Sequence, residues 1–192
     1  VLPDSAALWT DGRYFLQASQ QLAGSGIELM RMGEPGVPEI ADFLRDHVAE
    51  NGFIGFDSRT ISNAFARTIG EKTCEKHIRF AGGEDLVDLV WADRPALSCE
   101  PVWALDVKYA GLTRAEKLQK VREKMAKLGA DVFVIPALDE VAWLLNLRGG
   151  DVLYTPVFLS YLLLTHDQAT LCVQKEAVSA EIEASLRADG VT

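Results

Sequence analysis

The sequence has few of the residues that nucleophilic catalysis and metal binding most often use. It contains three cysteines and three histidines in 192 residues, and Cys74, Cys99 and Cys172 stand far apart, outside any CxxC spacing. Neither a disulfide framework nor a redox or zinc motif fits this pattern, so we expect reduced, mostly buried thiols of a cytoplasmic protein. No HxxxH or HExxH motif brings histidines together, so we expect this segment to bind no metal ion by itself.

Other motifs and one class of partner are also missing. The chain has no GxSxG nucleophile elbow and neither of the phosphate loops GxxxxGK[ST] and GxGxxG. Its longest apolar run, PVFLSYLLL, is far shorter than the roughly 20 residues that cross a bilayer, so we expect no membrane span. The formal net charge of −9 repels a phosphate backbone, which argues against general nucleic-acid binding.

What remains is a globular composition in which strand and helix patterns alternate. Hydrophobic residues make up 48% and charged residues 24%, enough to build a sizeable core. The alternation predicts an α/β fold of two units, with mixed β-sheets flanked by helices. The predicted strands are AALW, IELMRM, FIGFD, KHIRFA, DVFVIPA (as a buried strand), and the pair VFLSYLLLT and ATLCVQ. The predicted helices follow Asp11 and Pro38, begin at the caps Ser58, Thr113 and Asp139, and end with one through Val178, Ile182 and Leu186.

The pattern breaks in the middle of the chain, which suggests a domain boundary. We predict the latter part of a first domain at residues 1–88, an apolar linker at 89–112 and a second domain at 113–192. DLVDLVW is interpreted as a short helix or strand, and the linker tryptophans, Trp91 and Trp103, are expected to be packed between domains.

An internal similarity suggests that the two domains are copies of one unit. VLPDSAALW…LAGSGIEL near the start matches LLTHDQATL…LRADGVT at the end in its order of elements. The sequence has no initiator Met and starts inside a strand-like pattern. We therefore expect a piece of a longer protein, with the first domain incomplete at its start and the second truncated.

The helix that follows Thr113 carries many basic residues. Thr113 and Glu116 form a capping-box pattern. The basic residues could suggest a nucleic-acid site, but the apolar stripe is regular and two glutamates interrupt the charges, so we interpret them as a solvated face. They are Arg114, Lys117, Lys120, Arg122, Lys124 and Lys127.

Two short stretches carry the candidate functional residues. In WTDGRYFLQ the helical spacing after Asp11 predicts a strand-to-helix joint, with Asp11 accepting hydrogen bonds at the helix start. Arg13 is expected to brace Asp11 or to reach a neighbouring domain. In the NLRGGD loop, Asn146, Arg148 and Asp151 allow two interpretations: a glycine-capped helix end with a surface arginine, or a loop that presents Arg148 to a ligand or domain.

Several stretches together resemble a known family. They are LWTDGRYFLQA, GEPGVP, DLVW…RP and ALDEVAWLLNLRGGDVLYTPVFLSYLLL, and they look like the amino-terminal half of Xaa-Pro aminopeptidases (aminopeptidase P). The closest likeness is to the three-domain type, with two creatinase-type amino-terminal domains in tandem. The resemblance covers nearly all 192 residues and implies two copies of one α/β unit.

The resemblance also implies an activity that this segment does not perform. The family members are metallopeptidases that release the N-terminal residue preceding proline. Their carboxy-terminal pita-bread domain holds two divalent metal ions, usually manganese, through two Asp, one His and two Glu. No position here matches those ligands, so the resemblance implies a non-catalytic region that shapes access to the active site and helps in subunit contacts.

Partners and alternatives follow from the same resemblance. It implies the pita-bread domain as a partner, a homodimer, proline-containing peptides as substrates, and Asn146, Arg148 and Asp151 facing substrate or that domain. One alternative is the amino-terminal region of a prolidase or creatinase relative. Another is a metal-free protein-binding module, whose acidic surface would suit basic partners.

Overall fold

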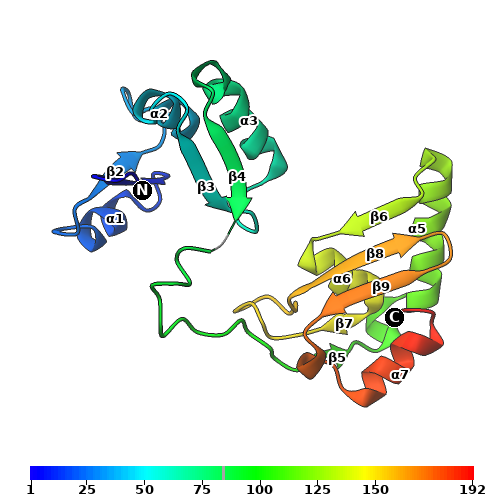
Figure 1. The fold of residues 1–192 in the computed structure, drawn as a ribbon. Coiled ribbons are helices and arrows are strands. Elements are labelled where there is room, and N and C mark those ends of the chain that lie inside the picture. Colours follow the sequence, from blue (N-terminus) through cyan, green and yellow to red (C-terminus); the bar gives the residue numbers. More distant parts are fainter. Residues whose placement is uncertain (84) are drawn as a thin grey trace. The chain divides into compact units, whose positions relative to one another are not determined.

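The computed structural model describes residues 1–83 and 85–192, and the chain divides into two compact units. Unit 1 is Val1–Arg94 and unit 2 is Pro95–Thr192, and each combines helices with short β-sheets (Figure 1). The boundary lies inside residues 89–112, the predicted linker. No helix in the described residues is long and apolar enough to cross a bilayer.

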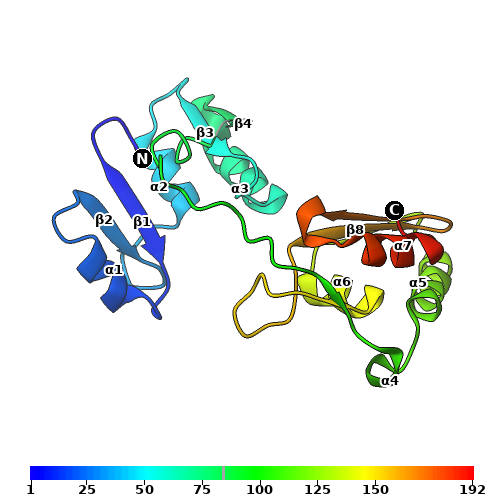
Figure 2. The same ribbon diagram turned by 90° about the horizontal axis from the view of Figure 1, so that it is seen from below.

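Unit 1 contains two pairs of parallel strands, each closed by a helical crossover, as parallel pairing requires. In the first pair, strand β1 (Ala6–Thr10) pairs with β2 (Ile27–Arg31), and α1 (Phe15–Gln21) lies between them in sequence. The second pair and the connecting helix (Figures 1 and 2) comprise α2 (Ile40–His47), β3 (Phe53–Asp57), α3 (Asn63–Thr73), the 3₁₀ turn η1 (Cys74–Lys76) and β4 (Arg79–Gly83).

The start of α3 differs from the prediction. The Ser62 hydroxyl accepts a hydrogen bond from the Phe65 amide at 3.2 Å and caps the helix, so the predicted cap at Ser58 is wrong. The reason is the turn that follows β3. The Asp57 carboxylate accepts from the Arg59 amide at 2.9 Å, and this local turn delays the helix by one turn of chain.

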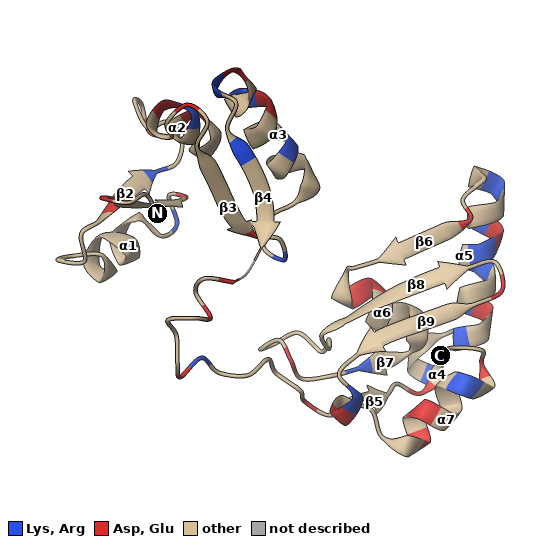
Figure 3. Cartoon of the chain, in the orientation of Figure 1, with Lys and Arg blue, Asp and Glu red and all other residues tan. Residues whose placement is uncertain are grey.

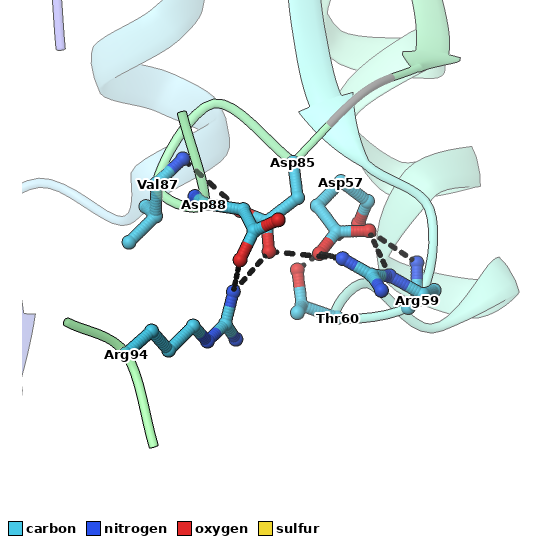
Figure 4. Close-up of polar contacts among 7 residues, drawn as sticks. All are labelled: Asp57, Arg59, Thr60, Asp85, Val87, Asp88 and Arg94. Atoms are coloured by element: carbon cyan, nitrogen blue, oxygen red, sulfur yellow. Dashed lines mark hydrogen bonds and ion pairs between the residues drawn. The ribbon is translucent and has the colours of Figure 1, made fainter. Parts of the chain in front are cut away.

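Residues 85–94 close unit 1 through a cluster of ion pairs, the Asp85 cluster (Figure 4), formed by Asp57, Arg59, Asp85, Asp88 and Arg94. The Asp85 carboxylate accepts from Arg59 at 2.9 Å and from Arg94 at 2.5 Å. It also accepts from two backbone amides of the turn that follows. Residues 86–90 form turns, so the predicted helix or strand in DLVDLVW is wrong.

Replacing Arg94 by alanine is expected to release this turn without unfolding unit 1. Exposed ion pairs contribute little to global stability, but Arg94 joins Asp85 and Asp88 to the end of the unit. Chymotrypsin should therefore cleave after Leu89 and Trp91 several-fold faster in Arg94→Ala, as read by mass spectrometry.

The matched control for this experiment is Arg67→Ala, at an exposed position of α3. An equal cleavage rate in the two variants would contradict the proposed restraint. Acid is expected to act like the mutation, because Arg94 holds the pKa of Asp85 below its ordinary value. The restraint is present above the pKa of the unfolded aspartate and is lost as the pH falls through the lower, folded pKa.

Unit 2 is built on a three-stranded antiparallel sheet and a second, two-stranded pair. The sheet order is β6 (Val132–Ile135), β8 (Ser160–Thr165), β9 (Ala169–Val173), which confirms the predicted strand pair around HDQ. The shorter pair joins β5 (Trp103–Ala104) to β7 (Leu147–Arg148). The helices are α4 (Val107–Ala110), α5 (Arg114–Leu128), α6 (Leu138–Leu145) and α7 (Ala180–Ala188), with the 3₁₀ turn η2 (Lys175–Ala177).

Helix α5 begins and ends as predicted. The Thr113 hydroxyl accepts from the Glu116 amide at 3.2 Å, while the Glu116 carboxylate accepts from the Thr113 amide at 2.8 Å. This is a complete capping box, and Gly129 ends the helix with a φ of 66°. The predicted cap of α6 is wrong, because Asp139 lies within the first turn and the Ala137 position before the helix makes no side-chain cap.

The core of unit 2 gathers α5, α6, α7 and the inner face of the sheet. It is formed by Val102, Leu118, Met125, Ile135, Val141, Ala142, Leu144, Leu145, Leu147, Val157, Phe158, Leu162, Leu164, Ala169, Ala177, Leu186 and Val191. Strand β6 was predicted to be buried, but only Ile135 is. It forms the edge of the sheet, and Val134 on the outer face, opposite Leu163, stays exposed.

One further expectation about burial is wrong. Cys74 and Cys172 are exposed and Cys99 is half-buried, all three as free thiols. Trp91 and Trp103 are 45% and 48% exposed, and their packing between domains stays a prediction. An apolar composition predicts that side chains pack together, but it does not say which face of a short strand or turn is buried.

The internal similarity corresponds to one repeated crossover. Ala6 pairs with Ile27 in parallel, and Ala169 pairs with Val191 in parallel. Helix α1 lies between the first two and α7 between the second two. Both units therefore contain a strand and a helix that lead to a parallel partner, which is a full strand in unit 1 and a single bridge residue in unit 2. Their remaining strands pair in parallel in unit 1 and antiparallel in unit 2. The predicted α/β fold with mixed sheets is confirmed.

Candidate functional site

The NLRGGD loop begins at the end of α6 and leads through β7 to the inner strand of the sheet. Asn146 ends the helix in the left-handed conformation, with a φ of 53°, which asparagine tolerates better than most residues. Its side chain is buried, and both polar atoms of its amide group make hydrogen bonds. The Nδ2 group donates to the Leu112 carbonyl at 2.8 Å, and Oδ1 accepts from Lys117 at 2.6 Å.

Three cationic side chains converge on the carboxyl end of helix α6. The last carbonyls of a helix lack intrahelical partners and carry partial negative charge. Lys117 Nζ donates to the Trp143 carbonyl at 2.7 Å. Arg114 and Arg148 donate to two other carbonyls of the same turn, those of Leu145 at 2.9 Å and Ala142 at 2.8 Å.

The burial of two of these cations corrects the prediction for α5. Figure 3 shows basic residues along the whole helix, but Arg114 is 7% exposed and Lys117 only 1%. Both lie on the buried side of the helix, beside Leu118. The predicted solvated face is therefore wrong for them, although Lys120 and Lys124 are exposed as expected. The three- and four-residue spacing from Arg114 to Met125 could have revealed this.

The two buried cations are stabilised in different ways. Arg114 pairs with Asp189 at 2.8 Å; burial lowers the pKa of Arg114 and the carboxylate opposes that shift. Lys117 has no carboxylate within ion-pair distance among the described residues. It lies 4.2 Å from the centre of the Trp143 ring. Burial and, secondly, the charge of Arg148 lower the pKa of Lys117.

Asp151 closes the loop and ties three segments together. Its carboxylate accepts from the Ser98 hydroxyl at 2.7 Å, the Glu100 amide at 2.9 Å and the Leu159 amide at 2.8 Å. Burial alone would raise the pKa of Asp151, but these hydrogen bonds outweigh it and the pKa lies below its ordinary value. Gly149 lets the chain approach closely, because a Cβ there would lie 2.7 Å from Phe158 Cβ.

The turn after Asp151 carries two exposed residues that the sequence did not single out. The Thr155 amide donates to the Val152 carbonyl at 3.1 Å, and Val152 and Thr155 form a β-bridge. Tyr154 adopts a φ of 64°, a left-handed conformation that costs a non-glycine residue about 1–2 kcal/mol. Leu153 is 76% exposed and Tyr154 96%. The available signal was two large apolar residues where a turn normally carries Gly or Asn.

The joint at Asp11 lies in unit 1. The Asp11 carboxylate accepts from the Arg13 amide at 3.0 Å and pairs with the guanidinium at 2.7 Å. The hydrogen bonds of Arg13 lower the pKa of Asp11 to about 2. Helix α1 starts later, at Phe15, and Tyr14 before it makes no side-chain cap. Asp11 thus braces the turn, but it does not cap the helix as predicted.

The predicted residues of the NLRGGD loop lie together, but their described contacts are architectural. Asn146 and Asp151 bond to neighbouring segments, and Arg148 donates to the carbonyls of Ala142 and Leu147. Across residues 1–83 and 85–192, no three His, Cys, Asp or Glu side chains gather closely enough to hold a metal ion. The described residues therefore do not fit a di-metal site, which the family resemblance places in a carboxy-terminal domain.

Two models of the same family match the chain, one to each unit. A creatinase/prolidase N-terminal domain model matches residues 1–90, and a second model with that description matches residues 93–192. The gap between the two matches lies close to the boundary between the units, which falls between Arg94 and Pro95.

Relatives match along the whole chain. Aminopeptidase P2 of Arabidopsis thaliana is 42% identical over 194 residues, covering 100% of this chain and 27% of the relative. A probable Xaa-Pro aminopeptidase P of Neurospora crassa is 43% identical over 198 residues, covering 99% and 28%. The chain thus spans less than a third of the length of these relatives.

A solved structure is similar over the same extent. X-prolyl aminopeptidase from Caenorhabditis elegans, a cytosolic enzyme with a di-nuclear active site, matches with a TM-score of 0.92 and 34% identity, covering 100% of this chain and 31% of that one. With a family model on each unit and the fold agreeing throughout, this chain belongs to the creatinase/prolidase N-terminal domain family, with two such domains in tandem.

Proposed function

We propose that residues 1–192 are the non-catalytic amino-terminal region of an Xaa-Pro aminopeptidase, a metal-dependent hydrolase that releases the N-terminal residue preceding proline. The observation that carries this proposal is 42–43% identity along essentially the whole chain to proteins named aminopeptidase P2 and probable Xaa-Pro aminopeptidase P. An Xaa-Pro bond is a tertiary amide without an N–H group. It therefore calls for a dedicated site, which we assign to the part of the enzyme outside these residues.

The cofactor and partners belong to the same proposal. Two divalent metal ions, manganese in the family resemblance, would be held by a carboxy-terminal pita-bread domain. The di-nuclear active site of the Caenorhabditis elegans enzyme supports this assignment. We further propose that the intact protein is a cytoplasmic homodimer acting on proline-containing peptides.

For the predicted site residues, we propose that Arg148 and Asp151, with Asn146 as the helix end behind them, form the side of unit 2 that faces the catalytic domain. The intrachain hydrogen bonds of Asn146 and Asp151 support a loop of fixed shape. Asp11 and Arg13 serve as a structural joint, supported by their mutual ion pair.

The test is an assay of the intact protein with manganese. Release of arginine from Arg-Pro-Pro is expected, with little release from a matched peptide that carries alanine in place of the first proline. Preferential cleavage of an Ala-Pro dipeptide would point to a prolidase relative instead. A protein that is purified without metal and stays inactive on all three substrates after manganese is added would favour a binding module and overturn the proposal.

A further inference from the structure

The turn Val152–Thr155 is an apolar projection on a fixed base. The chain between β7 and β8, gold in Figures 1 and 2, extends as a loop from unit 2. From Val152 to Val157 it carries no charged residue. Loops at a protein surface are ordinarily rich in polar residues, so an uncharged loop with Leu153 and Tyr154 at its tip is unusual for a part that meets only water.

The base of the turn is held in one geometry. The Asp151 amide donates to the Val157 carbonyl at 3.2 Å and the Val157 amide to the Thr155 carbonyl at 2.8 Å. The Asp151 carboxylate joins the base to the backbone of Glu100 and Leu159. A tip on such a base loses little freedom when it is bound, which favours binding.

The tip also holds an unfavourable backbone conformation. Tyr154 has a positive φ of 64° although its side chain is 96% exposed. No packing of the Tyr154 ring within unit 2 compensates for this conformation, because almost all of the ring faces solvent. Strained residues of this kind cluster at sites of contact and function.

We propose that the Leu153–Tyr154 tip docks into an apolar recess in the part of the same polypeptide that lies outside residues 1–192, the catalytic part of the proposed enzyme. This inference rests on the proposed function for the identity of that part. The relatives are more than three times as long as this chain, so such a part exists in them.

The small size of the tip favours an intrachain occupant over a second molecule. A stable interface between separate proteins buries about 800 Å² on each partner and uses about 20–30 residues a side. The tip has only two large exposed side chains, Leu153 and Tyr154. Within one polypeptide the two surfaces are already held at high effective concentration, so a contact of this size is sufficient.

The test uses the intact protein with the photocrosslinking residue p-benzoylphenylalanine in place of Tyr154. Irradiation is expected to give an intrachain crosslink from position 154 to residues beyond 192, located by mass spectrometry. The control carries the same residue in place of Tyr109, which is 74% exposed in the same unit and is expected to give at least several-fold less of this product. A crosslink only to residues 1–192, only between two copies, or no more than in the control would overturn the inference.

A second variant keeps the test independent of crosslinking chemistry. Tyr154→Gly relieves the positive φ and removes the ring, so folding of unit 2 is preserved while docking is weakened. Amide exchange at Leu153 and Thr155 in the intact protein is expected to become at least several-fold faster, and an unchanged rate would contradict docking. The two proposals can fail separately. A protein that forms the crosslink but has no aminopeptidase activity would refute the proposed function and support docking. An active protein that does not form the crosslink would support the proposed function and refute docking.

Discussion

Replacing Lys117 by methionine is expected to lower the free energy of unfolding of unit 2 by about 2 kcal/mol. The change keeps most of the side-chain volume and leaves buried acceptors without their donor, above all Asn146 Oδ1. The Trp143 carbonyl loses a hydrogen bond of 2.7 Å as well. A buried acceptor without a partner costs about 1–3 kcal/mol, more when its donor was charged.

The loss of unfolding free energy is limited, because the mutation also removes an unfavourable contribution. Burial of the Lys117 ammonium without a carboxylate partner carries a desolvation cost, seen in its lowered pKa. Methionine removes that cost, so we expect a smaller loss than the roughly 3–5 kcal/mol of a broken buried ion pair. Urea unfolding followed by circular dichroism measures the difference, with Lys120→Met, at an exposed position of the same helix, as a control within about 0.5 kcal/mol of wild type.

A double-mutant cycle identifies the orphaned acceptor as the cause. Asn146→Gly removes Oδ1 and suits the left-handed conformation at the end of α6. In that background Lys117→Met is expected to cost at least about 1 kcal/mol less than alone. Equal costs in the two backgrounds would show that Lys117 acts through packing and not through this hydrogen bond.

The pH dependence of the same variant has a defined sign. Because the folded pKa of Lys117 lies below the ordinary value of 10.5, the unfolded chain binds this proton more tightly. Between the two pKa values the stability of wild type rises with pH through this residue. The rise is absent in Lys117→Met, so the difference between the two proteins grows toward pH 10.

Replacing Asp151 by asparagine is expected to cost about 2–3 kcal/mol at pH 7. The carboxylate accepts three hydrogen bonds, from Ser98, Glu100 and Leu159, and hydrogen bonds to a charged acceptor are about twice as strong as neutral ones. An amide keeps one of the two oxygens. Its NH₂ group must then face a backbone N–H, which leaves a donor of the loop base without an acceptor.

The same unfolding experiment between pH 7 and pH 3 tests the origin of this effect. The pKa of Asp151 in the folded chain lies below the ordinary value of 3.8, so its contribution is complete above that value and is lost as the pH falls through the folded pKa. The difference between wild type and Asp151→Asn should therefore shrink in acid. Asp139→Asn, at an exposed first-turn position of α6, should cost less than about 1 kcal/mol. A cost for Asp151→Asn no larger than this would contradict the anchoring role.

Features set by neighbouring residues were predictable, and those set by distant partners were not. The capping box of Thr113 and Glu116 and the end of α5 at Gly129 depend on residues within one turn. The choice of Ser62 over Ser58 as a cap already depended on how the Asp57 carboxylate is used. The many basic residues of α5 predicted an exposed Lys117. Its position on the helix instead buries it against the end of α6.

The candidate site shows the same division. Asn146, Arg148 and Asp151 were expected together because they are close in sequence. Arg148 donates to nearby carbonyls, those of Ala142 and Leu147. Asn146 and Asp151 instead bond to Leu112, Lys117, Ser98 and Glu100, which no local pattern connects to the loop. The sequence did not single out the Leu153–Tyr154 tip. Its distinguishing features are the positive φ of Tyr154 and the high exposure of both side chains, and residue type alone predicts neither.

The repeated strand–helix–strand element has a consequence for how the protein forms during synthesis. Both strand pairs of unit 1 join segments that are close along the chain, Ala6 with Ile27 and Phe53 with Arg79. Short separations cost little loop-closure entropy and allow fast pairing. Domains generally fold as units from the amino terminus as the ribosome delivers them. The two strand pairs of unit 1 can therefore form, and the Asp85 cluster can fasten the end of the unit, while unit 2 is still being translated.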